Sequence, residues 1–336
     1  MLLKRLEVEN FTVFKDLKVD FSNGINIFIG VNGTGKTHLM KILYAATQAA
    51  RHDVSFTNKL VRLFKPDNME IHRLISRAQG NTKSNVTIFA DDGANISVGF
   101  HNKTKKWDGI ISGKEEWEKK FPDIIATFIP AKEILSNSWN LESAVNKNNV
   151  DFDDTYVDII ASAKIDISKG RDTDKNKKYL NILRQITKAS VLVEKERFYL
   201  KPGSYAKLEF PLVAEGIRKV ALLWQLIKNG TLENGSILFW DEPEANINPM
   251  NIPIIVDLLL ELERDGVQIF ISTHDYILAK YFAIRKKGNH IKYYSLYDSS
   301  IGIVCDCSDS FVGLKNNPLI QAFDTLLDEV YAEQKR

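Results

Sequence analysis

The stretch Gly30-Val31-Asn32-Gly33-Thr34-Gly35-Lys36-Thr37 matches the pattern G-x-x-x-x-G-K-[ST] at every fixed position. The apolar run before it, Ile25 to Ile29, predicts a buried strand, and His38 to Ala50 after it predicts a helix. Glycines at this kind of turn let backbone N–H groups surround a phosphate, which a Cβ would obstruct. The stretch therefore predicts a phosphate-binding loop rather than a turn with a solvated lysine.

Each part of this loop has an expected role toward ATP and Mg²⁺. Lys36 would reach the β- and γ-phosphate oxygens, and the Thr37 hydroxyl would bind Mg²⁺. The N-terminus of the following helix would direct its positive end at the same anion. The residues expected to bind the nucleotide are Asn32, Gly33, Thr34, Gly35, Lys36, Thr37 and His38.

Two acidic residues follow a second apolar run, Ile237 to Trp240. Asp241 ends this predicted strand, where it would bind Mg²⁺, and Glu242 would act as general base toward the attacking water. Because Pro243 follows, the two acids could instead cap a helix. The phosphate loop earlier in the chain favours the catalytic interpretation.

A third apolar run, ending at Ile271, leads into Ser272-Thr273-His274-Asp275. His274 at this strand end could donate a hydrogen bond to the γ-phosphate and hold the attacking water. The alternative is a structural histidine. With Lys36 and Glu242, His274 completes the set of expected catalytic residues.

Strands that alternate with helices predict an α/β fold with parallel central strands. Residues 1–135 are expected to form a nucleotide-binding lobe with an antiparallel β subdomain, including a hairpin over Asn85 to Lys106. Residues 136–205 have a polar, helical pattern and are expected to form a helical insertion. Residues 206–336 would complete the core.

In this order, the motifs resemble the ABC-type ATPases, most closely the RecF, SMC and OLD-like branch and the small bacterial AAA-type ATP-binding proteins associated with defence systems. Glu9 to Phe14 resembles the opening strand motif of that branch. Asp241 to Pro249 resembles its extended Walker B motif and D-loop, and Ser272 to His274 its switch histidine. The resemblance implies a P-loop NTPase of the ABC-ATPase head type, with a mixed central sheet.

The resemblance also implies a signature sequence that opens a helix, and Val213 to Lys219 stands in that place. Gly216 would let the helix N-terminus approach the γ-phosphate held by a second copy, so it is expected to bind nucleotide in trans. Ala214 replaces the usual serine, which predicts weaker dimer closure unless Arg218 and Lys219 compensate. An ordinary core helix is the alternative.

The stretch Phe128 to Glu133 stands where the family has its Q-loop, but it contains no glutamine. The Q-loop contact to Mg²⁺ or water is therefore left without a residue.

The composition is that of an ordinary globular protein. The 336 residues include 45 Lys and Arg against 43 Asp and Glu, a net charge of +2 that neither demands nor excludes nucleic acid. Two cysteines, Cys305 and Cys307, predict reduced thiols and a cytoplasmic location. With no signal peptide and no long apolar run, no membrane partner is expected.

These features predict an ATPase that forms a homodimer around ATP, with further association open, and regulates a separate effector such as a nuclease or toxin in antiphage defence. Asp306 and Asp309 are too isolated to form a nuclease site in the chain itself. The alternatives are a RecF-like DNA-repair ATPase and a non-hydrolysing ATP-bound scaffold; a transporter subunit is disfavoured. Nucleic acid could contact three basic clusters, namely Lys103, Lys105 and Lys106; Lys175, Lys177 and Lys178; and Arg285, Lys286 and Lys287.

Overall fold

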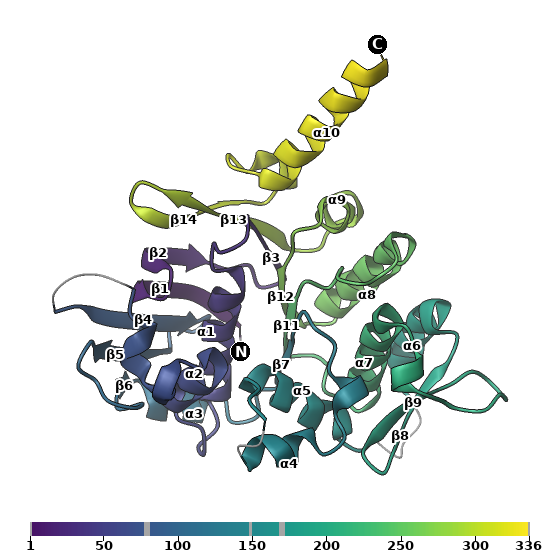
Figure 1. Cartoon of the computed structure of the whole chain (residues 1–336), viewed down its shortest axis with the longest axis horizontal. Coiled ribbons are helices and arrows are strands. Elements are labelled where there is room, and N and C mark those ends of the chain that lie inside the picture. Colours follow the sequence, from purple (N-terminus) through teal and green to yellow (C-terminus); the bar gives the residue numbers. More distant parts are fainter. Residues whose placement is uncertain (1, 77–80, 148–149, 168–171, 335–336) are drawn as a thin grey trace. The chain divides into compact units, whose positions relative to one another are not determined.

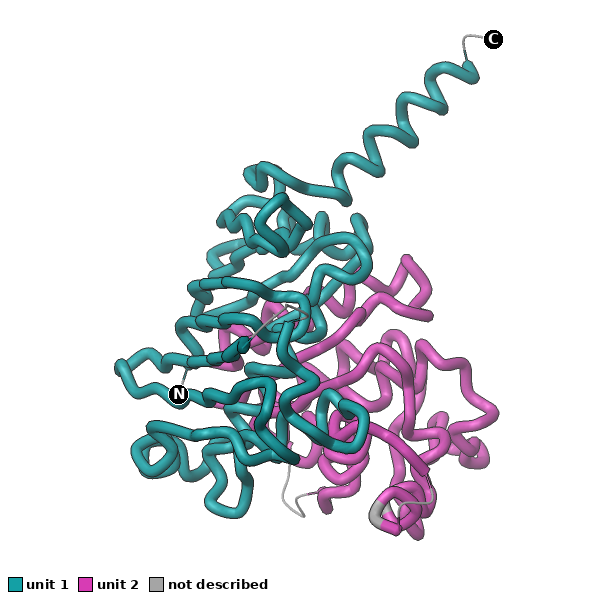
Figure 2. Tube along the Cα trace, turned by 60° about the vertical axis from the view of Figure 1, so that its left-hand side comes forward, with its two compact units in different colours: residues 1–124, 270–336 teal, residues 125–269 magenta. Residues whose placement is uncertain are grey.

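The computed structural model describes residues 2–76, 81–147, 150–167 and 172–334. They form two compact units, shown in different colours in Figure 2: unit 1 comprises residues 1–124 and 270–336, and unit 2 comprises residues 125–269. Unit 2 is thus continuous in sequence, whereas unit 1 is built from two separate segments. The sequence predicted three parts, residues 1–135, 136–205 and 206–336, which were divided by the order of the motifs along the chain. The two units are divided by contacts in the structure, so the three-part division stays a prediction.

One sheet of unit 1 is antiparallel, with the strand order β2-β1-β4-β5-β6. Its hairpin pairs β4 with β5, with Val86 opposite Val98, as the alternating pattern predicted. Every second residue of β4 is buried, so this sheet presents one face to the core. The strands are β1 (Leu3–Phe11), β2 (Phe14–Asp20), β4 (Lys83–Ala90), β5 (Asn95–His101) and β6 (Ile110–Ser112).

Unit 1 also contains the strand that leads to the phosphate loop, β3 (Ile25–Ile29), in which all five residues are buried. It pairs in parallel with β13 (Ile291–Ser299), which pairs in antiparallel fashion with β14 (Gly302–Ser308). Cys305 and Cys307 lie on β14 as free thiols. The helices of unit 1 are α1 (Lys36–Gln48), α2 (Phe56–Phe64), α3 (Lys114–Lys120), α9 (Tyr276–Arg285) and α10 (Pro318–Gln334) (Figure 1).

Unit 2 contains a parallel pair of buried strands, β7 (Ala126–Ile129) and β11 (Ile237–Asp241), with Trp240 opposite Ile129. Burial on both faces explains why these strands are continuous apolar runs rather than alternating ones. The helices of unit 2 are α4 (Leu141–Asn146), α5 (Asp154–Lys164), α6 (Asp174–Thr187), α7 (Glu215–Lys228) and α8 (Ile252–Arg264).

A small antiparallel sheet, β10-β9-β8, also belongs to unit 2. Its strands are β8 (Ser190–Glu194), β9 (Arg197–Lys201) and β10 (Leu208–Glu209). The helical pattern expected over residues 136–205 is wrong for Ser190–Glu194, which form strand β8. Strand β8 pairs along its whole length with β9 through a tight turn, and this pairing decides its conformation.

The chain leaves unit 2 and enters unit 1 within strand β12 (Gln268–Ser272), whose five residues are all buried. Among the described residues, no helix combines the length and apolar character needed to cross a membrane.

Candidate nucleotide-binding site

The phosphate loop connects β3, which ends at Ile29, to α1, which begins at Lys36. Its first glycine, Gly30, has a φ of +149°, and a Cβ there would overlap the carbonyl oxygen of Leu296 on β13. Gly35 has a φ of +90° and is the N-cap of α1. A Cβ at Gly35 would overlap the side chains of Phe14 and Val13. A side chain at either glycine is therefore excluded both by close packing and by backbone conformation.

Lys36 lies over the loop that precedes it. Its Nζ donates hydrogen bonds to the carbonyl oxygens of Gly30, at 2.9 Å, and Val31, at 3.1 Å. The Thr34 hydroxyl also donates to the Val31 carbonyl, at 2.9 Å. Asn32 and Gly33 form the exposed tip of the loop, and nothing lies within 4 Å of a Cβ built on Gly33. The loop is thus folded as a cradle at the N-terminus of α1, with open space at its tip.

His38, in the first turn of α1, contacts the β1–β2 turn and α2. Its Nδ1 lies 3.1 Å from the Thr12 hydroxyl, in the β1–β2 turn, and its ring contacts Phe64 edge-on. Burial, and then the charge of Lys41, lower the pKa of His38 from 6.5 to about 4. The imidazole is therefore neutral near pH 7, and the expected part of His38 in nucleotide binding stays a prediction.

The segment that carries His274 lies beside β3 in unit 1. The backbone N–H of Thr273 donates to the carbonyl of Phe28 at 3.0 Å. The carboxylate of Asp275 accepts from the N–H of Leu278 and caps α9. Asp275 is thus structural, while His274 is half-buried and follows directly on the contact with β3. Unit 1 therefore brings the strand ends that carry the phosphate loop and His274 side by side.

The two acidic residues lie at the end of β11 in unit 2. Asp241 is its last residue and is 7% exposed. Glu242 has a φ of +46°, an uncommon conformation for a residue other than glycine. Turns follow, and the next helix is the 3-10 helix Pro249–Asn251, capped by Asn248. The alternative in which Asp241 and Glu242 cap a helix is therefore wrong.

The turn after Glu242 packs on the N-terminus of α7, the predicted signature helix. A Cβ on Gly216 would overlap the carbonyl oxygen of Asn246, so this glycine has a packing role inside unit 2. Lys219, 1% exposed, donates from Nζ to the carbonyl oxygens of Ala245, at 3.0 Å, and Glu242, at 3.5 Å. Burial lowers the pKa of Lys219, and the charges of Glu215, Glu244, Glu242 and Asp241 act in the opposite direction.

Arg218, next to Lys219, also has its partners inside unit 2. It donates from Nε to Glu133 at 2.6 Å, and from Nη1 to the carbonyls of Phe210 and Val213 at 3.3 and 2.5 Å. Glu133, whose side chain is 2% exposed, also accepts from the N–H and hydroxyl of Ser136. The expectation that Arg218 and Lys219 compensate for Ala214 at a dimer interface is thus weakened, because both bond within their own unit.

The sequence analysis missed Glu133, which lies in the stretch without a glutamine. The sequence gives little indication of the role of Glu133, because it is a single acid after Pro130 and its partner, Arg218, lies 85 residues away. Only the fold brings it to Arg218.

The remaining expected ligands divide between the units: Thr37 belongs to unit 1, and Asp241 and Gly216 to unit 2. Within the described ranges, no three His, Cys, Asp or Glu residues gather as a metal site.

The three basic clusters differ in how far their charges are neutralised. Lys178 pairs with Glu261 on α8, and Lys175 pairs with Asp265, the C-cap of that helix. Lys177 pairs with Asp174. Lys286 donates to backbone carbonyls. The cluster at Lys175 to Lys178 is therefore a poor phosphate-binding surface.

Comparison with known proteins agrees with this geometry. The family described as "AAA domain, putative AbiEii toxin, Type IV TA system" matches residues 115–279. The DNA replication and repair protein RecF of Lactococcus lactis subsp. cremoris is 31% identical over 88 residues, which cover 26% of this chain and 24% of that protein. RecF of Ligilactobacillus salivarius is 35% identical over 88 residues, which cover 26% of this chain and 23% of that protein. The match thus spans about a quarter of the length of these relatives.

Two solved structures cover nearly the whole chain. An SMC head bound to the C-terminal winged-helix domain of ScpA has a TM-score of 0.61 at 12% identity, covering 92% of this chain and 98% of that one. The Smc head domain with an extended coiled coil, bound to the C-terminal domain of ScpA from Pyrococcus furiosus, has a TM-score of 0.56 at 13% identity, covering 98% and 99%. The fold is that of an ABC-ATPase head.

Fold and matches together point to one class: the chain has the head fold of the ABC-type P-loop ATPases, and parts of its sequence are similar to the RecF/SMC-like branch of that class.

Proposed function

We propose that this protein is an ATP-hydrolysing switch that dimerises around ATP and regulates a separate effector. The observation that carries the proposal is the glycine cradle at the N-terminus of α1, over which Lys36 is already folded. The Lys36 ammonium donates to two backbone carbonyls. A bound triphosphate offers it stronger, charge-assisted partners at the same end of the helix.

The proposed chemistry assigns one role to each remaining residue. Thr37 and Asp241 would hold Mg²⁺, which would supply charge neutralisation for the bound triphosphate. Glu242 accepts a proton from the attacking water, and His274 donates a hydrogen bond to the γ-phosphate. Gly216 brings the N-terminus of α7 to the nucleotide held by a second copy.

The separate effector is proposed from the described residues and the family match. No acidic cluster in those residues could form a nuclease centre. The matching family is described as a putative toxin of a toxin–antitoxin system, which supports a role in a system of that kind. We extend this to a partnership with a nuclease or toxin in antiphage defence.

The test of hydrolysis is Glu242→Gln, with Glu233→Gln in the same unit as the matched control. Loss of the general base should slow phosphate release by roughly 10²- to 10⁴-fold, with ATP binding retained. The variant should also accumulate as an ATP-bound dimer, measured by light scattering. Turnover of Glu242→Gln at the wild-type rate would refute the assignment of Glu242 as general base. Binding of ATP by the wild-type protein without any turnover would instead favour the ATP-bound scaffold.

A RecF-like ATPase acting directly on DNA is the second candidate, favoured by the identity to RecF over 88 residues. Binding of the isolated protein to DNA, with an affinity that falls steeply as salt rises, would favour it. Co-purification of a nuclease or toxin from the native operon would favour the switch.

A further inference from the structure

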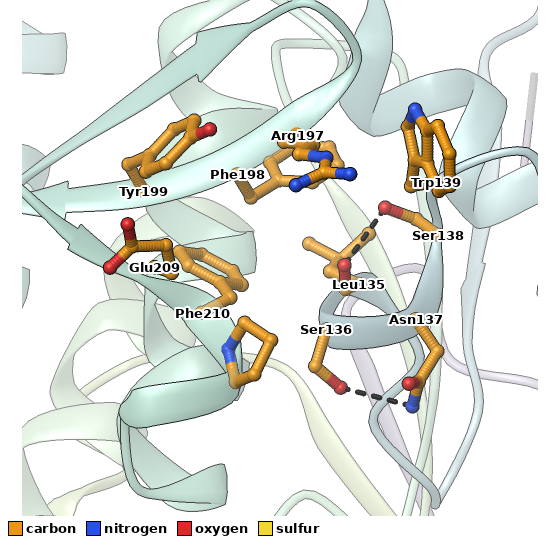
Figure 3. A pocket seen from close by; sticks show the side chains of 11 residues that line it. Leu135, Ser136, Asn137, Ser138, Trp139, Arg197, Phe198, Tyr199, Glu209 and Phe210 are labelled. Atoms are coloured by element: carbon orange, nitrogen blue, oxygen red, sulfur yellow. Dashed lines mark hydrogen bonds between the residues drawn. The ribbon is translucent and has the colours of Figure 1, made fainter.

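Unit 2 contains a cavity of about 320 Å³ immediately before the signature helix (Figure 3). One wall is the segment from Leu135 to Trp139; the other consists of β9 and the 3-10 helix Phe210–Leu212. Leu135, Phe198 and Phe210 are buried and give it an apolar floor. Trp139 at the rim is 55% exposed. This volume is sufficient for one or two large side chains.

A cationic group lies at the mouth of this cavity. The Arg197 guanidinium lies over the Trp139 ring, 4.6 Å from its centre, and Figure 3 shows both at the same end of the cavity. The two acids that precede Arg197 in the chain, Glu194 and Glu196, pair with Lys207 and Lys164 instead. Glu209 also lines the cavity, with its carboxylate directed away from Arg197 (Figure 3). The mouth thus suits a carboxylate beside an apolar side chain.

Both walls of the cavity are held by Arg218 of the signature helix. One wall is bonded through the Phe210 and Val213 carbonyls, and the other through Glu133, which accepts from Ser136. An occupant would therefore press on the residues that fix Arg218, two positions after Gly216.

A segment of matching chemistry is exposed on unit 1. Helix α10 extends away from the rest of that unit in both views (Figures 1 and 2). One face is apolar yet exposed, at 36% to 60%, and acids lie on both sides of this face. The apolar residues are Phe323, Leu326, Leu327, Val330 and Tyr331, and the acids are Asp324, Asp328, Glu329 and Glu333.

We propose that α10 of one copy docks into this cavity of a second copy, with an aromatic side chain in the cavity and an adjacent carboxylate on Arg197. Two α10 helices would cover each other's apolar faces less well than this cavity does, because their like charges would repel. Over Pro318–Gln334 each helix carries four acids and no base. A nucleic acid strand fits less well, because a single cation lines the cavity together with an acid. Mutual exchange of α10 closes a two-fold dimer.

The first test is a photo-cross-linking amino acid at Tyr331, with Thr325 on the opposite face of α10 as control. Position 331, but not 325, should cross-link to residues 135–139 or 197–211. A mixture of ¹⁴N- and ¹⁵N-labelled copies should give cross-links between copies. Cross-links only within one copy, or only elsewhere, would overturn the proposal. The nucleotide-binding variant Lys36→Ala should cross-link equally, so failure of the ATP switch and failure of this contact can be told apart.

The second test is charge reversal in the full-length chain. Arg197→Glu should weaken the nucleotide-free dimer roughly tenfold or more, whereas Lys201→Glu on the same strand should not. Asp324→Arg with Asp328→Arg should restore the dimer of Arg197→Glu. A fluorescent peptide of residues 318–334 should bind wild type and not Arg197→Glu. No rescue, or displacement of that peptide by single-stranded DNA, would reject α10 as the occupant.

Discussion

Two lysines, Lys36 in unit 1 and Lys219 in unit 2, make the same kind of contact. Each is nearly buried, 6% and 1% exposed, and each donates from Nζ to two backbone carbonyls of a loop that follows a buried strand. The loops differ in what they leave open. Lys36 spans a glycine cradle with an exposed tip, whereas Lys219 lies beneath the Glu242–Ala245 turn, inside the protein.

This difference means that one lysine can bind a ligand, whereas the other can only bind the backbone of its own unit. Lys36 can exchange its carbonyls for phosphate oxygens, because the tip of its loop is open. Lys219 supports the backbone that carries Glu242, which is held at a φ of +46°. One lysine is therefore expected to bind substrate, and the other to position the general base.

The largest expected effect comes from removing the first lysine. Lys36→Ala should weaken ATP binding by at least about 100-fold, since charge-assisted hydrogen bonds contribute roughly 1.5–3 kcal/mol each. Isothermal titration calorimetry would measure it. Lys41→Ala, on the same helix, is the matched control. If Lys36→Ala bound ATP as tightly as wild type, Lys36 would not be a substrate-binding residue, and the proposed difference from Lys219 would be wrong.

Arg218 tests whether the contacts around Lys219 are structural. Arg218→Met leaves the buried Glu133 carboxylate without its partner and should lower the free energy of unfolding by about 3–5 kcal/mol. Urea denaturation of this variant and of Glu133→Gln with Arg218→Met would measure it, and the double variant should regain part of the loss. A loss below about 0.5 kcal/mol would mean that the pair is a surface contact.

Lys219→Met should change catalysis more than nucleotide affinity. Met keeps the length of the side chain but leaves the Glu242 and Ala245 carbonyls without their donor, so kcat should fall roughly tenfold with KM little changed. Lys228→Met, on the same helix but paired with Asp172, is the control and should retain wild-type kcat. A rise in KM alone would contradict a positioning role.

The smallest effect concerns pH and the neutral histidine beside the phosphate loop. The folded-state pKa of His38 is about 4 and its ordinary value is 6.5, so its contribution to stability is present above pH 6.5. It is lost as the pH falls toward 4, because the unfolded chain binds the proton first. Wild type should lose roughly 2 kcal/mol more than His38→Gln over this range, measured by urea denaturation. Parallel pH profiles would contradict it.

Much of the fold could be predicted because its signals are local. The Gly30 to Thr37 motif, the buried runs before it and before Asp241, and the hairpin of β4 and β5 are each readable within a few residues. Helix α7 begins and ends where its amphipathic pattern begins and ends. The roles of Asn32 to His38, Asp241, Glu242, His274 and Gly216 toward ATP stay predictions.

The remaining features depend on contacts between distant residues. Neither the Glu133–Arg218 pair nor the burial of Lys219 has a periodic signal, since a charged side chain is normally exposed. Strand β8 was mistaken for helix because its pairing with β9, and not its composition, decides its conformation. The packing of Gly216 on Asn246 likewise needs the fold, although the glycine itself was singled out.

Unit 1 is assembled from both ends of the chain, and this affects how the protein is made. Unit 2 emerges from the ribosome as one uninterrupted segment. Strand β3 cannot pair until its parallel partner β13 has been synthesised, because Ile25 pairs with Ile291, 266 residues later. The Leu296 carbonyl that closes against Gly30 arrives at the same late stage. A nascent chain that stalls before β13 would carry every residue of the ATP motif and still lack the surroundings that shape it.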